Sequence, residues 1–189
     1  DPHSHMAMLC YKNGSLAREE VCRAVTGDKG NWQKFGELID SGPAGNGGNL
    51  GFFVFEPEII PKIPQTGVRR FDSSGSAVES FEPHIEARAI IEGQFLSYRL
   101  HAGRLGLSPS CIIATGGASK NKHFTKIMAD VFGTSVDSAS QPDSASLGAA
   151  CRALQGWECQ KAGEFVSFAS VAPELQNHTR VAEPDMAAH

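Results

Sequence analysis

The chain has 189 residues, of which 41% are hydrophobic and 20% are charged, and its formal net charge is −4. This composition is that of an ordinary globular protein with enough residues for a real core. The negative charge argues against the basic surface by which proteins bind nucleic acid, and no apolar run is long enough to span a membrane.

The cysteines are five in number, and none belongs to a C-x-x-C pair. This usage indicates free thiols in a reducing compartment, and it predicts a cytoplasmic protein. His84, His101 and His123 stand alone in the sequence, without the neighbouring ligands that metal sites use. We therefore expect neither disulfides nor a metal site.

The first residues, D-P-H-S-H-M, are typical of an expression vector, and we leave residues 1–6 out of the fold. The apolar run from Ala7 to Tyr11 follows abruptly, so we expect a fragment that begins inside a strand. Helices are predicted over residues 16–25 and 32–39, the second with Trp32, Phe35 and Ile39 on one side. Taken alone, Trp32 is typical of a core or hinge residue.

Residues 41–51 contain five glycines in eleven positions, which predicts a loop with several residues at positive φ. A flexible linker would have the same composition. The strongly apolar residues 50–55 follow directly, however, and favour a loop that enters a core strand. Residues 56–67 are rich in proline and predict extended surface chain, and residues 69–80 predict a loop with at most an edge strand.

The longest helical pattern runs from Pro83 to Leu105. A short apolar run, residues 111–115, then predicts a strand covered on both faces. A Gly-Gly-Ala-Ser turn comes next, followed by a helix over residues 121–132 that Gly133 ends, a short strand and a helix over residues 144–154. Beyond Gly156 the periodicity is lost, and residues 159–189 are predicted to be irregular.

The turn from Gly116 to Ser119 is the stretch that most suggests chemistry. Two glycines at the carboxyl end of a strand let a ligand approach the backbone, and the helix N-terminus that follows offers N–H groups to an anion. Ligands of open α/β sheets bind at that end of the strands. A nucleotide site is one interpretation, and a tight connection between strand and helix is the other.

Several segments together resemble the xylulose kinases, sugar kinases of the FGGY group, and the animal-type members above all. The resemblance covers about residues 8–156. It rests on A-M-L-C-Y-K-N-G-S-L-A-R-E, G-N-G-G-N-L-G-F, I-E-A-R-A-I-I-E-G-Q, I-I-A-T-G-G-A-S-K-N, A-D-V-F-G-T-S-V and D-S-A-S-L-G-A-A-C-R-A, in this order.

The resemblance implies an α/β fold of the actin-like ATPase, ribonuclease-H-like type, with a mixed sheet and flanking helices. Residues 7–158 would be a partial C-terminal kinase domain, similar to the part of the enzyme that binds the nucleotide. Such enzymes hold ATP and the sugar in a cleft between two domains. The implied cofactors are ATP and Mg²⁺, and the implied partners are ATP or ADP, D-xylulose and the missing N-terminal kinase domain.

The resemblance also implies the residues of the nucleotide site. Gly117 and Asn121 match the family's glycine and asparagine that line this site, with Gly116 and Ala118 beside them. Trp32 matches a tryptophan that borders the adenine.

The general base and the phosphate loops of the family have no counterpart in this sequence, and Asp130, Asp137 and Asp143 do not match the base. The parent enzyme would convert D-xylulose to D-xylulose 5-phosphate, whereas this chain alone is expected to be inactive. The first two strands of the domain are also expected to be missing, which leaves a sheet edge unpaired. A non-catalytic nucleotide-binding or interaction domain, and an FGGY kinase for another sugar, are the alternatives.

Overall fold

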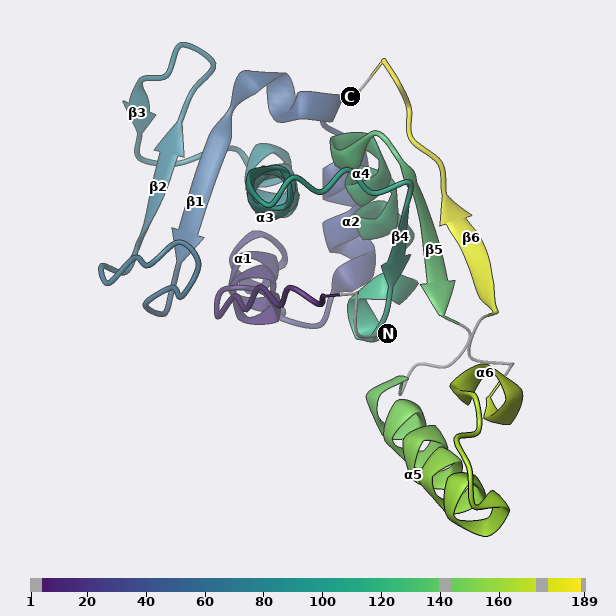
Figure 1. The fold of residues 1–189 in the computed structure, drawn as a ribbon. Coiled ribbons are helices and arrows are strands. Elements are labelled where there is room, and N and C mark those ends of the chain that lie inside the picture. The colour runs from purple at the N-terminus through teal and green to yellow at the C-terminus, as the bar shows by residue number, and fades with distance from the viewer. Residues whose placement is uncertain (1–4, 140–143, 173–176, 188–189) are drawn as a thin grey trace. The chain divides into compact units, whose positions relative to one another are not determined.

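The computed structural model describes residues 5–139, 144–172 and 177–187, and the chain divides into two compact units, residues 1–101 and 102–189. Figure 1 labels the helices and strands of both units. Of the residues predicted to come from an expression vector, residues 1–4 lie outside the described part of the chain. No helix among the described residues is long and apolar enough to cross a membrane.

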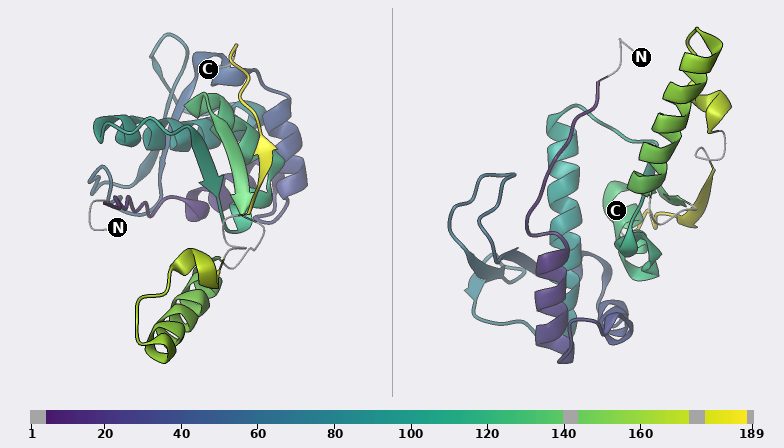
Figure 2. Two further views of the ribbon diagram at one scale, coloured as in Figure 1. Left: turned by 45° about the vertical axis from the view of Figure 1, so that its right-hand side comes forward. Right: turned by 90° about the horizontal axis from the view of Figure 1, so that it is seen from below.

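The first unit is built around the long helix α3 (Pro83–Arg104), whose residues 102–104 count with the second unit. Figures 1 and 2 show α3 between a three-stranded sheet and another helix, α2. The sheet is antiparallel, in the order β1-β2-β3. In chain order the elements before α3 are α1 (Ser15–Thr26), α2 (Trp32–Asp40), the 3-10 turn η1 (Ala44–Gly48), β1 (Leu50–Val54), β2 (Gly67–Phe71) and β3 (Ala77–Val78).

Strand β1 packs on α3 through residues with little or no side chain. A Cβ added at Gly93 of α3 would lie 2.9 Å from the carbonyl oxygen of Gly51, and one at Gly51 would lie 3.1 Å from the Cβ of Ala89. Phe53 is buried on the same side of the strand, whereas Phe52 is 53% exposed on the other. The prediction of a core strand is therefore correct for one face of β1 only.

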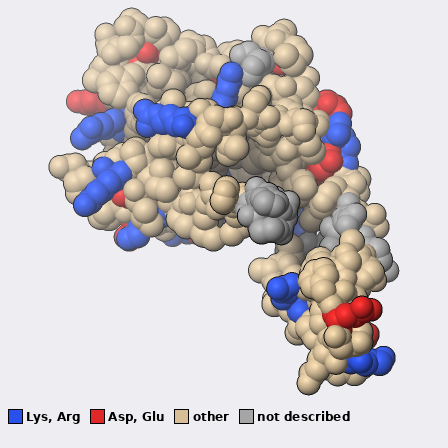
Figure 3. Space-filling model, viewed as in Figure 1, with Lys and Arg blue, Asp and Glu red and all other residues tan. Residues whose placement is uncertain are grey.

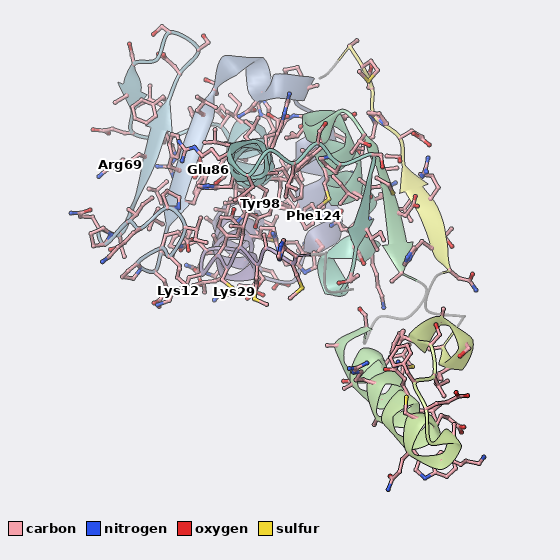
Figure 4. The ribbon with its side chains drawn as sticks, viewed as in Figure 1. Lys12, Lys29, Arg69, Glu86, Tyr98 and Phe124 are labelled. Atoms are coloured by element: carbon pink, nitrogen blue, oxygen red, sulfur yellow. The ribbon has the colours of Figure 1, made fainter. Side chains whose placement is uncertain are left out.

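Strand β2 corrects the prediction that residues 69–80 form a loop with at most an edge strand. It is the central strand of the sheet, between β1 and β3. One of its charged residues faces inward, because the guanidinium of Arg70 pairs with the buried carboxylate of Glu86 on α3. Figure 4 labels Glu86. The distance from Arg70 Nε to Glu86 Oε2 is 2.7 Å.

The side chain of Asn13 joins the start of α1 to the chain that follows β1. Its Oδ1 accepts hydrogen bonds from the amides of Phe55 (2.8 Å) and Glu56 (3.0 Å). Its Nδ2 donates to the carbonyl oxygen of Glu56 (2.8 Å) and to Glu58 Oε2 (2.9 Å). Gln94 of α3 donates to the carbonyl oxygen of Asn13 itself (2.7 Å). The residue is 7% exposed, so a polar side chain fills a place in the core with each of its bonding atoms satisfied.

The second unit contains a sheet in the order β4-β5-β6, with β4 parallel and β6 antiparallel to β5. One cluster of its buried residues consists of small side chains, Ala114, Ala129, Val136 and Ala182, against which Ile112 and Met128 pack. Phe124 and Ile127 of α4 are also buried in this unit. Ile113 is 50% exposed, so β4 is not covered on both faces as predicted. The elements are β4 (Cys111–Ala114), η2 (Gly117–Lys120), α4 (Lys122–Phe132), β5 (Ser135–Ala139), α5 (Ser144–Ala162), α6 (Phe168–Val171) and β6 (His178–Ala182).

The prediction that residues 159–189 are irregular is wrong for much of that segment. Helix α5 continues to Ala162, α6 follows, and β6 completes the sheet. Arg180 on β6 forms an ion pair with Asp137 on the neighbouring strand β5. The predicted ends of the helices before this segment are within one residue of the observed ends for α2, α3 and α4.

The contact between Gly93 and Gly51 gives the first prediction. We expect Gly93→Ala to lower the free energy of unfolding by about 1–3 kcal/mol, because the added methyl group must push β1 away from α3. Gly103→Ala on the same helix is the matched control, since its Cβ meets no atom within 4 Å. Urea denaturation of both variants checks this, and equal stability of the two would contradict it.

Candidate functional site

The turn after β4 begins at Gly116, which has φ 79° and ψ −173°. Side chains with a Cβ rarely adopt this conformation, so glycine is required here for the backbone to leave the strand in this direction. The 3-10 turn η2 follows from Gly117 to Lys120, and α4 begins directly after Asn121.

Ser119 closes the turn from within. Its Oγ donates a hydrogen bond to the carbonyl oxygen of Gly116 (2.7 Å), and its backbone N–H donates to the same oxygen (3.2 Å). The backbone N–H of Ser119 is therefore used inside the turn and is not aimed at a ligand.

Asn121 is the N-cap of α4. Its Oδ1 accepts hydrogen bonds from the amides of His123 (3.0 Å) and Phe124 (3.3 Å), which satisfies two of the unpaired donors at the start of the helix. The side chain of Phe124 is buried and anchors the first turn of α4 in the unit (Figure 4). The cap uses Oδ1 of the Asn121 side chain. The Nδ2 group of the same side chain could donate a hydrogen bond to a ligand.

The backbone of the turn is open on its outer side. A Cβ added at Gly116 or Gly117 would meet no atom within 4 Å, and Gly117 and Ala118 are exposed. Because β5 is parallel to β4, this turn lies at the carboxyl end of a parallel strand pair, where ligands of α/β sheets bind. The structure therefore brings together Gly116, Gly117, Ala118 and Asn121, four of the five predicted site residues.

The fifth residue, Trp32, belongs to the first unit, where it is the first residue of α2. Asn31 caps this helix by accepting a hydrogen bond from the amide of Lys34 (3.1 Å). The indole is half-buried and meets the ring of Phe35 edge to face, with a centroid distance of 5.8 Å. Phe35 is fully buried, so it gives the indole a rigid support while part of the indole stays accessible.

The aspartates that the sequence offers near this turn are engaged in other interactions. Asp130 pairs with Lys126 and accepts the amide of Asp185 (2.7 Å). The guanidinium of Arg180 holds the pKa of the Asp137 carboxyl below its ordinary value, which makes this group a weaker base. Asp143 lies outside the described residues. Neither of the two described aspartates is placed as a general base.

Sequence reasoning missed the charged residues that shape the glycine-rich loop. Arg88 and Glu92 of α3 are both 8% exposed, and each bonds to the backbone beside or within that loop. Their signal was present in I-E-A-R-A-I-I-E-G-Q, where charges one helical turn apart stand among apolar residues.

The face shown in Figure 3 bears lysines and arginines scattered among other residues rather than joined in one stripe.

Comparison with known proteins identifies the family. The model of the C-terminal domain of the FGGY family of carbohydrate kinases matches residues 64–157. Xylulose kinase 2 of Arabidopsis thaliana is 43% identical over an alignment of 184 residues, which covers 90% of this chain and 32% of that protein. The chain belongs to the FGGY family of carbohydrate kinases. The xylulose kinase of Mus musculus is 39% identical over 191 residues, covering 100% of this chain and 33% of its own length.

The solved structures show the fold of this FGGY chain. The xylulose kinase from Rhodospirillum rubrum matches 95% of the chain, with a TM-score of 0.71 and 22% identity, over 35% of its own length. The ligand-bound xylulose kinase from Lactobacillus acidophilus matches 94%, with a TM-score of 0.72 and 20% identity, also over 35% of its length. FGGY kinases have the actin-like ATPase fold, which confirms the predicted fold class. The chain spans about one third of the length of these relatives.

The geometry of the turn gives the second prediction. We expect Gly116→Ala to lower the free energy of unfolding by about 1–3 kcal/mol, because alanine is strained at a φ of 79°. Gly117→Ala is the matched control and should change it by no more than about 1 kcal/mol in either direction. Thermal unfolding of both variants checks this, and a Gly117→Ala variant as unstable as Gly116→Ala would contradict it.

Proposed function

We propose that this chain is the ATP-binding, C-terminal part of a kinase that transfers the γ-phosphoryl group of ATP to D-xylulose, giving D-xylulose 5-phosphate. The observation that carries the nucleotide part is the open turn at Gly116 and Gly117, at the carboxyl end of β4 and in front of the capped helix α4. The identity of 43% and 39% to proteins named xylulose kinases supports the sugar.

Four of the five predicted site residues have a direct role in this proposal. Gly117 and Ala118 let the nucleotide lie against the backbone, because neither carries a side chain larger than a methyl group. Asn121 donates from Nδ2, since its Oδ1 is used by the cap of α4. The indole of Trp32 packs beside the purine, supported from behind by Phe35.

We propose that Mg²⁺ binds to this part of the site together with the nucleotide. Within residues 5–139, 144–172 and 177–187, no group of three or more His, Cys, Asp or Glu side chains could hold a metal ion. Mg²⁺ is commonly bound through substrate phosphates and one or two carboxylates, and it neutralises charge on the phosphates during transfer. The nucleotide's phosphates are therefore its main ligands on this side of the site.

We also propose that the chain alone does not phosphorylate xylulose. Asp137 is paired with Arg180 and Asp130 with Lys126, so neither is a suitable base for the sugar hydroxyl. The base would come from an N-terminal kinase domain, which is the partner that the relatives' threefold greater length suggests. A cytoplasmic location belongs to the same proposal, and the five cysteines, all with free thiols, support a reducing compartment.

Phosphorylation of another sugar is the alternative, because the fold alone does not set the substrate. The gluconate kinase from Lactobacillus acidophilus has a TM-score of 0.71 to this chain, close to those of the xylulose kinases, at 21% identity. The fold is therefore shared by kinases of different substrates. Assays of the parent enzyme against xylulose and gluconate decide between the two.

The third prediction tests nucleotide binding by the chain itself. Of the two tryptophans, Trp157→Phe removes one and leaves Trp32 as the fluorescent reporter. We expect MgADP to quench Trp32 saturably, and Gly117→Val to weaken binding by at least about tenfold, or ~1.4 kcal/mol, because the new side chain fills the open space over the turn. Asn121→Asp should also weaken binding, because it retains the cap acceptor but replaces the Nδ2 donor.

The matched control is Gly156→Val, which places the same side chain at an exposed glycine of α5 with no atom within 4 Å. This variant should bind MgADP as the parent chain does. Unchanged affinity in Gly117→Val, or absence of binding by a folded parent chain, would contradict a nucleotide half-site in this chain.

A further inference from the structure

Helix α3 buries two charged side chains one helical turn apart, Arg88 and Glu92. Both are 8% exposed, and the distance from Arg88 Nε to Glu92 Oε1 is 2.6 Å. A buried ion pair seldom stabilises a fold more than apolar side chains of the same volume would, because both charges lose their hydration. What such a pair can provide is a defined arrangement of the backbone groups to which it is bonded.

Arg88 is bonded to the end of α2. Its Nη1 lies 3.2 Å from the carbonyl oxygen of Ile39, in the last turn of that helix, and 3.2 Å from the carbonyl oxygen of Gly42 just beyond it. Carbonyl groups at a helix C-terminus lack partners within the helix and carry partial negative charge, so a guanidinium is well suited to hold them. Through these bonds α3 sets the position of the helix that begins with Trp32.

Glu92 is bonded to the glycine-rich loop that follows. Its Oε1 accepts the amide of Gly45 (3.0 Å), the first of four successive residues with positive φ, Gly45 to Gly48. Asn46 is the one residue of this run that is not glycine, and its φ of 51° is unfavourable for a residue with a Cβ. Its Nδ2 donates to the carbonyl oxygen of Ile85 on α3 (3.1 Å). The loop therefore holds an uncommon backbone conformation while bonded to α3 at two points.

A second ion pair on the same helix provides a comparison. Glu86, 7% exposed, pairs with Arg70 and so bonds α3 to the sheet, on the side away from α2. The two pairs are alike in residue type and in the burial of the glutamate. They differ in what they hold, which is β2 for Glu86 and the α2 end with the glycine-rich loop for Glu92.

We propose that Arg88 and Glu92 are positioning residues for nucleotide binding: they fix α2, and with it the orientation of Trp32, through the carbonyl groups at the end of α2 and the amide of Gly45. This inference rests on the proposed function, in which the indole of Trp32 packs beside the purine. Arg88 and Glu92 act through α2 and the loop and do not touch the nucleotide. A pair with a purely structural role would change stability without changing the environment of Trp32.

The test uses the full chain with Trp157→Phe, so that the emission spectrum reports Trp32 alone. Glu92→Gln is compared with its matched control Glu86→Gln, and each variant is measured by urea denaturation, tryptophan emission and MgADP titration. We expect both substitutions to lower stability. Glu92→Gln alone should shift the emission maximum of Trp32 and weaken MgADP binding by about fivefold or more, and Glu86→Gln should leave the affinity within about twofold.

Arg88→Lys is the second variant, and it decides the question if Glu92→Gln does not fold. A lysine keeps the charge but lacks the planar set of donors that bonds Glu92, Ile39 and Gly42 together, so the Trp32 emission should shift here too. Unshifted emission in both folded variants, or equal shifts in Glu86→Gln and Glu92→Gln, would overturn the inference. If the parent chain binds no nucleotide, the proposed function fails, and the emission spectra still decide whether the pair positions Trp32.

Discussion

The first unit depends on how α3 is fixed on both of its sides. Toward the sheet, the helix lies so close to β1 that Gly93 and Gly51 leave no space for a methyl group, and Glu86 reaches Arg70 on the next strand. Toward α2, Arg88 and Glu92 bond to backbone carbonyl and amide groups. Close apolar packing gives α3 its distance from the sheet, and directional bonds from buried charges give it its rotation and register.

In the second unit, one turn combines structural hydrogen bonds with the exposed backbone on which the proposed nucleotide site depends. Ser119 and Asn121 use hydrogen bonds to shape the turn and to begin α4, and this leaves the glycine backbone bare on its outer side. A site built in this way needs few side chains of its own.

The sequence was sufficient where local signals and packing agree. Gly133, with a φ of 64°, ends α4 as the pattern predicts, and the apolar stripe through Phe124 and Ile127 is buried. It failed where a polar residue faces inward. Strand β2 was predicted as a loop because its inward-facing residue is Arg70, which pairs with a buried carboxylate. The strand therefore lacks the alternation of apolar and polar residues by which strands are recognised. Strand β6 was missed for a similar reason, since its pairing with β5 is supported by Arg180 and Asp137.

The candidate site shows the same division. The Gly-Gly turn and the helix behind it are visible in sequence, because glycine and helical periodicity are local signals. The use of the Ser119 amide inside the turn, and of Asn121 Oδ1 as a cap, depends on backbone dihedral angles that the residue types do not fix. The bonds of Arg88 could not be predicted because its partners are carbonyl groups at the end of α2 and just beyond it, more than forty residues earlier.

The burial of the Asn13 side chain bears on glycosylation of this chain. The residues Asn13-Gly14-Ser15 form an acceptor sequence for N-linked glycosylation, and the atom that would carry the glycan is Nδ2. In the folded chain this nitrogen lies in the interior and donates to Glu56 and Glu58. An oligosaccharide attached there during passage through a secretory compartment would replace one of the two donor hydrogens on Nδ2 and could not be accommodated in the core. The same asparagine that completes the core thus makes this fold incompatible with glycosylation at its own acceptor sequence.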